Sequence, residues 1–159
     1  MRGTNDVQLL SILAVASLFG GMLLFSIGFG ALSFKLLEGK VARRFIRETF
    51  PYFYLWVLVN SLTAALVCYF VNKTSFIFLM IIFLTTIPNH RILMPAINDA
   101  SDSGNKKKFR NLHGFSVLIT FSHIVLSAYC LSFLLWHELY FNSYSLLKTA
   151  CQESRWIAF

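Results

Sequence analysis

Four long stretches of this chain are almost entirely apolar and are separated by short polar segments. A helix of roughly 20 apolar residues is long enough to cross a bilayer. The apolar stretches that meet this length cover residues 8–33, 50–71, 76–97 and 114–136. The pattern therefore predicts an all-α fold, an integral membrane four-helix bundle over residues 1–137. An amphipathic tail on the outer surface is expected for residues 138–159.

Composition agrees with this prediction. Of the 159 residues, 57% are hydrophobic and 13% are charged, whereas about a quarter of a soluble domain is charged. The first apolar stretch is longer than the core of a secretory signal, so we interpret it as a membrane span. The sequence does not indicate in which membrane the protein resides, and a bacterial inner, mitochondrial or secretory-pathway membrane each fits.

Polar side chains recur along one face of the last apolar stretch. They follow one another at steps of three and four residues, the spacing of one side of an α-helix: His113, Ser116, Thr120, His123, Ser127 and Cys130. Lipid offers these groups no hydrogen-bonding partner. We therefore predict that other helices cover this face and that a polar seam runs through the bundle.

The first two spans supply small and polar residues for helix packing. Ser17, Gly21 and Gly28 lie on one face of the first span, where small side chains let two helix backbones approach closely. Asn60 lies about halfway along the second span, where a buried amide calls for an interhelical hydrogen bond. We expect Asn60 to lie near the midplane, against His123 of the fourth span.

The third span is the least regular. Pro88 lacks a backbone donor and crowds the carbonyl four residues earlier, so a kink is expected there. Asn89 and His90 follow directly and are predicted to lie in the cytoplasmic half of the bilayer. His113, at the start of the fourth span, has a similar predicted depth and could face His90. Arg91 can extend to the polar boundary.

Basic residues are concentrated on one side of the predicted bundle. The net charge is +7, and ten of the fourteen Lys and Arg residues fall in or beside the first and third connections: Lys35, Lys40, Arg43, Arg44, Arg47, Arg91, Lys106, Lys107, Lys108 and Arg110. The positive-inside rule then places both termini on the outer or lumenal side. The basic face predicts anionic lipid as a partner and not nucleic acid, since no aromatic residues alternate with the charges.

Aromatic residues mark both predicted boundaries. Those at the inner end of the second span and the outer end of the fourth are Tyr52, Tyr54, Trp56, Trp136, Tyr140 and Tyr144. Such belts are typical of membrane–water interfaces.

Histidine in such a setting can be a hydrogen-bonded core residue, part of a headgroup or ion site, or a haem or metal ligand. No carboxylate lies within the four spans. This disfavours a proton relay and a hydrolytic triad, so we interpret the protein as non-enzymatic. No cofactor is predicted, and haem or metal binding by His90 and His113 is kept as an alternative.

Our leading hypothesis is a membrane protein that handles a lipid or another amphiphile. The predicted headgroup site comprises Arg43, Arg44, Arg47, Asn89, His90, Arg91, His113 and Ser116. The predicted polar seam comprises Asn60, Thr120, His123 and Ser127. The alternative from another class is a structural accessory subunit that assembles with other membrane subunits.

Several of these motifs together resemble the transmembrane-protein-205-like family. They are the small residues of the first span, the basic connection, Phe50–Pro51–Tyr52–Phe53, the stretch from Asn89 to Pro95, and Leu112–His113–Gly114–Phe115–Ser116. The resemblance covers most of residues 10–137 and implies a small four-span membrane protein. Members of this family have no settled biochemical activity and are associated with drug resistance, secretory traffic and mitochondrial lipid handling.

Overall fold

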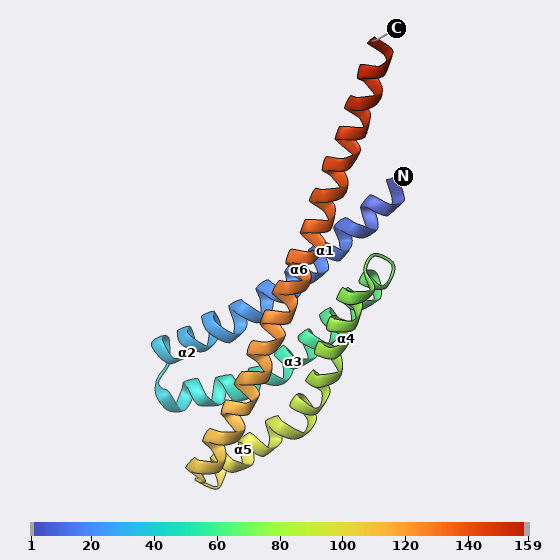
Figure 1. Cartoon of the computed structure of the whole chain (residues 1–159). Coiled ribbons are helices and arrows are strands. Elements are labelled where there is room, and N and C mark those ends of the chain that lie inside the picture. The colour runs from blue at the N-terminus through green and yellow to red at the C-terminus, as the bar shows by residue number, and fades with distance from the viewer. Residues whose placement is uncertain (1, 158–159) are drawn as a thin grey trace.

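The computed structural model describes the backbone of residues 2–157 and the side chains of residues 6–136 and 139–140. This part of the chain consists of helices joined by short turns and contains no strand (Figure 1). Two π-helical segments, η1 and η2, interrupt otherwise α-helical spans. In chain order the elements are α1 (Arg2–Leu23), η1 (Leu24–Phe29), α2 (Gly30–Leu36), α3 (Gly39–Tyr69), α4 (Lys73–Pro88), η2 (Asn89–Leu93), α5 (Met94–Asp102) and α6 (Lys106–Ile157).

Four helices are long and apolar enough to cross a membrane. They cover Asp6–Leu36, Gly39–Tyr69, Lys73–Asp102 and Lys106–Trp136. This confirms the prediction of an all-helical, four-span membrane fold. The marked ends of the chain and the α3–α4 turn lie toward one end of the bundle, and the other two connections lie toward the opposite end (Figure 1).

The spans form a closed ring in which α1 packs against α3, α3 against α4, α4 against α6, and α6 against α1. Large side chains from all four helices meet in the centre and are almost completely buried: Val15, Leu18, Met22, Val57, Leu79, Ile82 and Leu134. Short turns close the ring at both of its ends. Asn72 caps α4 by accepting a hydrogen bond from the Ser75 backbone N–H at 2.9 Å, and Gly104 adopts a φ of +67° between α5 and α6.

The buried face of the first span differs from the predicted one. Gly21 does lie at a helix contact, since a Cβ added there would come within 2.1 Å of the Trp56 ring of α3. Ser17 and Gly28, however, are exposed, and a Cβ on Gly28 would meet only Leu24 of the same helix. The face that packs is carried by larger side chains, and Gly21 is the residue of the predicted set that must leave room for a ring of α3.

The third span bends where the sequence predicts a kink. Helix α4 ends at Pro88, and η2 separates it from α5 (Figure 1). Pro95 sits at the start of α5 and lacks the N–H that would otherwise bond to the Arg91 carbonyl. The π-helical turn η2 lies between these two prolines, where the i to i−4 bond to the Arg91 carbonyl is missing.

Helix α6 continues without a break past its membrane span to Ile157 (Figure 1). The predicted tail over residues 138–159 is thus helical where its backbone is described, and it is continuous with the fourth span. The aromatic residue Tyr144 and most other side chains of this tail lie outside the described residues. Its orientation along a membrane surface stays a prediction.

Candidate functional site

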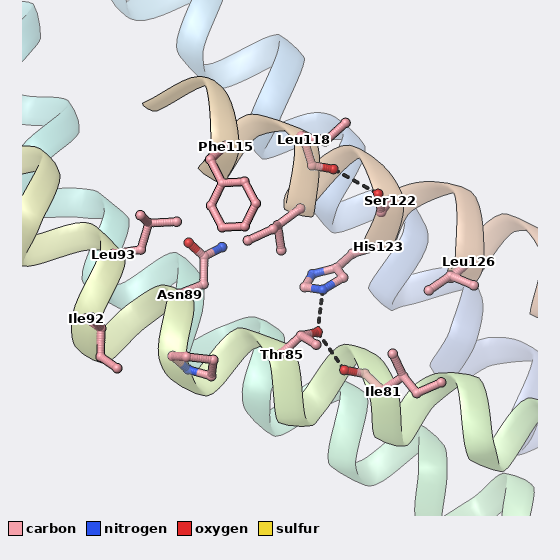
Figure 2. Close-up of a pocket in the computed structure, with 12 residues that line it drawn as sticks. Ile81, Thr85, Asn89, Ile92, Leu93, Phe115, Leu118, Ser122, His123 and Leu126 are labelled. Carbon is pink, nitrogen blue, oxygen red and sulfur yellow. Dashed lines mark hydrogen bonds between the residues drawn. The ribbon is translucent and has the colours of Figure 1, made fainter. Parts of the chain in front are cut away.

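A groove of about 560 Å³ lies between the third span and the first half of α6's membrane segment (Figure 2). Its walls are mainly apolar and are formed by Ile81, Pro88, Ile92, Leu93, Phe115, Leu118, Ile119 and Leu126. Four polar residues line it as well: Thr85, Asn89, Ser122 and His123. Mostly apolar walls with a few placed polar groups are typical of small-molecule sites.

One wall of the groove is supported by a buried hydrogen-bond chain that joins three helical elements. The Ser116 hydroxyl of α6 donates to Asn89 Oδ1 of η2 at 3.2 Å, and its oxygen lies 3.0 Å from the Tyr54 hydroxyl of α3. Serine has a single hydroxyl proton, so Tyr54 must be the donor to Ser116. The chain thus runs from Tyr54 through Ser116 to Asn89, and it fixes the Asn89 amide with its carbonyl oxygen turned toward Ser116.

The Asn89 amide nitrogen is the unsatisfied end of this chain. Asn89 is only 2% exposed, and its Nδ2 has no hydrogen-bond partner among the described residues. The side chain points into the groove, with its nitrogen on the side of His123 (Figure 2). A buried amide with two free N–H groups is unusual, since buried polar groups are nearly always paired.

The opposite wall holds His123 through a bond to α4. Its Nε2 lies 2.7 Å from Thr85 Oγ1, while the Thr85 hydroxyl also lies 2.6 Å from the Ile81 carbonyl, to which it donates. Because the threonine proton goes to that carbonyl, His123 must donate from Nε2. Burial in a groove that is lined by no carboxylate favours the neutral ring, in which Nδ1 carries a lone pair. No hydrogen bond to that nitrogen is present among the described residues.

Helical spacing explains why these groups converge. Thr85 and Asn89 are four residues apart and therefore lie on the same side of the third span. Ser116 and His123 are seven residues apart on α6 and face them, and both are buried. The structure thus brings Ser116 and His123, two residues of the predicted polar face of α6, against the irregular part of the third span.

Three further residues of this polar face bond within α6 or lie in the core. Thr120 donates to the Ser116 carbonyl and the buried Ser127 to the Ile124 carbonyl. Cys130 is buried in the core. These three residues pack the bundle and do not line the groove.

The structure does not bring three other predicted residues into the groove. The His90 ring packs against Tyr54 with ring centroids 5.9 Å apart. His113 is exposed and stacks on Phe109 of its own helix at 5.5 Å. Asn60 donates to the Trp56 carbonyl one turn back and makes no recorded bond to His123. The two histidine rings therefore have separate neighbours, and Asn60 is satisfied locally.

The predicted arginines lie at the far end of the bundle from the turn between α3 and α4. Arg43 donates to the Gly39 carbonyl, Arg44 pairs with Glu48 at 2.9 Å, and Arg91 is exposed. Arg47 makes two parallel bonds to the Asp102 carboxylate, at 2.7 and 2.8 Å, and so joins α3 to α5. None of these side chains lines the groove.

Sequence reasoning missed three residues of the site. Tyr54 is predicted to belong to an interfacial aromatic belt, but it is 4% exposed and donates to Ser116. Ser122 precedes His123 and lines the groove, although it lies off the predicted polar face of α6. Thr85 precedes Asn89 by one helical turn, and that spacing was the available signal for its role.

The fold and the groove define a multi-pass membrane protein. The chain belongs to the family described as domain of unknown function (DUF4149), whose model matches residues 13–106, more than half of its length. The matched region contains Tyr54, Thr85 and Asn89 and ends at the start of α6. Comparisons with curated proteins and with solved structures found no match.

Proposed function

We propose that this protein binds a membrane lipid or another amphiphile in the groove between the third span and α6, without catalysing a reaction. The observation that carries this proposal is the buried amide of Asn89, a groove residue whose side-chain nitrogen has no partner in the part of the chain that the structure describes. An unpaired buried polar group costs about 1–3 kcal/mol. A ligand that accepts a hydrogen bond from this amide would remove that cost.

The size and position of the groove fit an amphiphile. Small-molecule pockets have volumes of about 300–1,000 Å³, and this one measures about 560 Å³. Its rim residues Ile92, Phe115 and Leu118 are 69%, 57% and 60% exposed, and they lie on the outside of the bundle. An occupant can therefore place its polar group between the helices and leave its hydrocarbon chains in the bilayer.

The basic end of the bundle supports a particular orientation. We propose that Arg43, Arg91 and the Lys106–Lys108 run lie on an anionic cytoplasmic leaflet, with both termini on the outer or lumenal side.

The resemblance to the transmembrane-protein-205-like family supports the proposed binding of a lipid, because members of that family are associated with lipid handling.

An accessory role in a larger complex is the second candidate. The part of α6 beyond Trp136 extends clear of the bundle and offers a helical surface to a partner subunit (Figure 1). Stable subunits that co-purify with the chain, together with an unoccupied groove, would favour this role. Haem or metal binding by His90 and His113 is the third candidate, and an absorption and metal analysis of the purified protein tests it.

The lipid proposal can be tested by cross-linking in membranes. Cells are fed a fatty acid that carries a photoreactive diazirine, and after irradiation the labelled peptides of the purified protein are identified. Labelling is expected to concentrate in residues 81–93 and 115–126. Uniform labelling of all lipid-facing surfaces would contradict the proposal.

A matched pair of variants sharpens this test. Ser122 lines the groove, whereas Ser132 lies on the same helix outside it, and both hydroxyls are exposed and bond within α6. Ser122→Trp fills the groove and is expected to abolish the concentrated labelling. Ser132→Trp is expected to leave it unchanged, and equal effects of the two substitutions would refute the assignment.

A further inference from the structure

We infer that the occupant of the groove is an uncharged lipid whose polar group carries a hydroxyl, such as a diacylglycerol or a sterol. This inference rests on the proposed function and adds the chemical class of the ligand. It follows from the arrangement of one free donor and one free acceptor in a groove that has no charged wall.

The donor is the Asn89 amide. Its Oδ1 is occupied by the Ser116 hydroxyl, which leaves both N–H groups of Nδ2 available. The bond from Tyr54 to Ser116 fixes this arrangement, because it commits the serine proton to Asn89. The groove therefore offers two hydrogen-bond donors at this point to a ligand oxygen.

The acceptor is His123 Nδ1. The Nε2 proton is engaged with Thr85, so the second ring nitrogen presents a lone pair. His123 is 5% exposed and lines the same groove as Asn89. Figure 2 shows the imidazole and the amide directed toward the space between the two walls.

The axial separation between the levels of donor and acceptor suits a small polar group. Thr85 marks the level of His123, and Asn89 lies four residues further along the third span, about 6 Å at 1.5 Å per residue. A hydroxyl can accept from the amide and donate to the imidazole, either by itself or with a neighbouring ester carbonyl. A simple ester, ketone or ether has no proton to give to Nδ1 and leaves that lone pair unused.

Charge excludes an anionic headgroup from this position. The groove is lined by twelve residues, and none is Lys, Arg, Asp or Glu. The cation nearest to Asn89 in the sequence is Arg91, which is exposed and does not line the groove, and Arg47 is paired with Asp102. A phosphate bonded to Asn89 inside the groove would therefore be desolvated without a cation in the lining, which is unfavourable in hydrocarbon.

A series of related lipids tests the inference on the unmodified protein. The full chain is reconstituted in phosphatidylcholine nanodiscs and labelled with a photoreactive dioleoylglycerol. The competitors are 1,2-dioleoylglycerol, its 3-acetyl ester, dioleoylphosphatidic acid and cholesterol. The first three share the same acyl chains and differ only in a free hydroxyl, a blocked hydroxyl or a phosphate.

We expect dioleoylglycerol to compete about tenfold or more better than either analogue. The acetyl ester leaves the imidazole lone pair unpaired, and the phosphatidic acid brings a charge into a groove lined by no charged residue. Stronger competition by cholesterol than by dioleoylglycerol would identify a sterol as the source of the same hydroxyl chemistry. Equal competition by the acetyl ester, or preference for the phosphatidic acid, would overturn the inference and leave the proposed groove intact. Absence of any saturable labelling would overturn both.

Two substitutions at one position separate the acceptor from simple packing. His123→Phe fills similar space but removes both ring nitrogens, and it is expected to abolish the preference for the free hydroxyl. His123→Gln keeps a donor for Thr85 and an acceptor for the ligand, and it is expected to restore the preference in part. The readout is the ratio of alcohol to acetyl ester competition, which a general loss of stability does not change.

Discussion

The contact between Gly21 and Trp56 predicts a large difference between two adjacent glycines. A Cβ at Gly21 would lie 2.1, 2.6 and 2.9 Å from three carbons of the Trp56 ring, whereas a Cβ at Gly20 meets nothing within 4 Å. Carbon atoms in contact are about 3.5–4.0 Å apart, so Gly21→Ala must displace the indole by about 1.4 Å or more. The ring lies between α1 and α3, so such a displacement separates it from neighbours on one side and presses it against neighbours on the other.

The expected magnitude follows from the cost of overpacking a filled interface, about 1–3 kcal/mol. Both glycines lie in the same helix, so the change in helix propensity on substitution by alanine is common to the two variants and cancels in their difference. Gly21→Ala should therefore be about 1–3 kcal/mol less stable than Gly20→Ala.

Equilibrium unfolding in mixed detergent–dodecyl sulfate micelles, followed by circular dichroism, measures this difference. Trp56→Leu in the Gly21→Ala background serves as a control, because a smaller side chain leaves room for the new methyl group and should recover part of the loss. If the two alanine variants agree within about 0.5 kcal/mol, the close approach of α1 to α3 at Gly21 is refuted.

Three further predictions concern the polar and irregular parts of the bundle. Ser116→Ala should lower the free energy of unfolding by about 1–3 kcal/mol, because it leaves the Tyr54 hydroxyl and the Asn89 carbonyl both unpaired. Tyr54→Phe should lower it less, and the same unfolding assay checks this order. Arg47→Asp should speed hydrogen exchange in α5, and adding Asp102→Arg should reverse the effect; exchange that stays fast in the double variant would contradict the proposed tie between α3 and α5. Pro95→Ala restores a backbone donor and should straighten the third span, which a change in spin-label distance between the ends of α4 and α5 would reveal; an unchanged distance would mean that Pro95 does not maintain the π-helical turn.

The number of spans was predictable from the four long apolar stretches. The buried face of α6 was predictable because polar residues in a membrane helix are rare and must be covered by other helices. Ser116, His123, Ser127 and Cys130 are all buried as that reasoning expects. His113 is exposed because it lies near the beginning of α6, where this face of the helix is not covered by the other spans.

The buried face of α1 and the role of Tyr54 were not predictable by the same rule. From Leu9 to Leu23 the polar side chains of α1 are Ser11 and Ser17 alone, so this sequence does not separate residues that face lipid from residues that face the core. The packing face is offset from the small residues, and among those small residues only Gly21 has to fit a partner ring. Tyr54 has the composition of a belt residue, and its burial depends on Ser116, 62 residues away.

The uninterrupted course of α6 has a mechanical consequence. Ile157 lies 34 residues beyond His123, which corresponds to about 51 Å of helix at 1.5 Å per residue. A tilt of about 10° at the groove would therefore move the far tip sideways by about 9 Å. The same helix that forms one wall of the groove can thus act as a lever arm, and any small adjustment of that wall would become a large displacement beyond the membrane span.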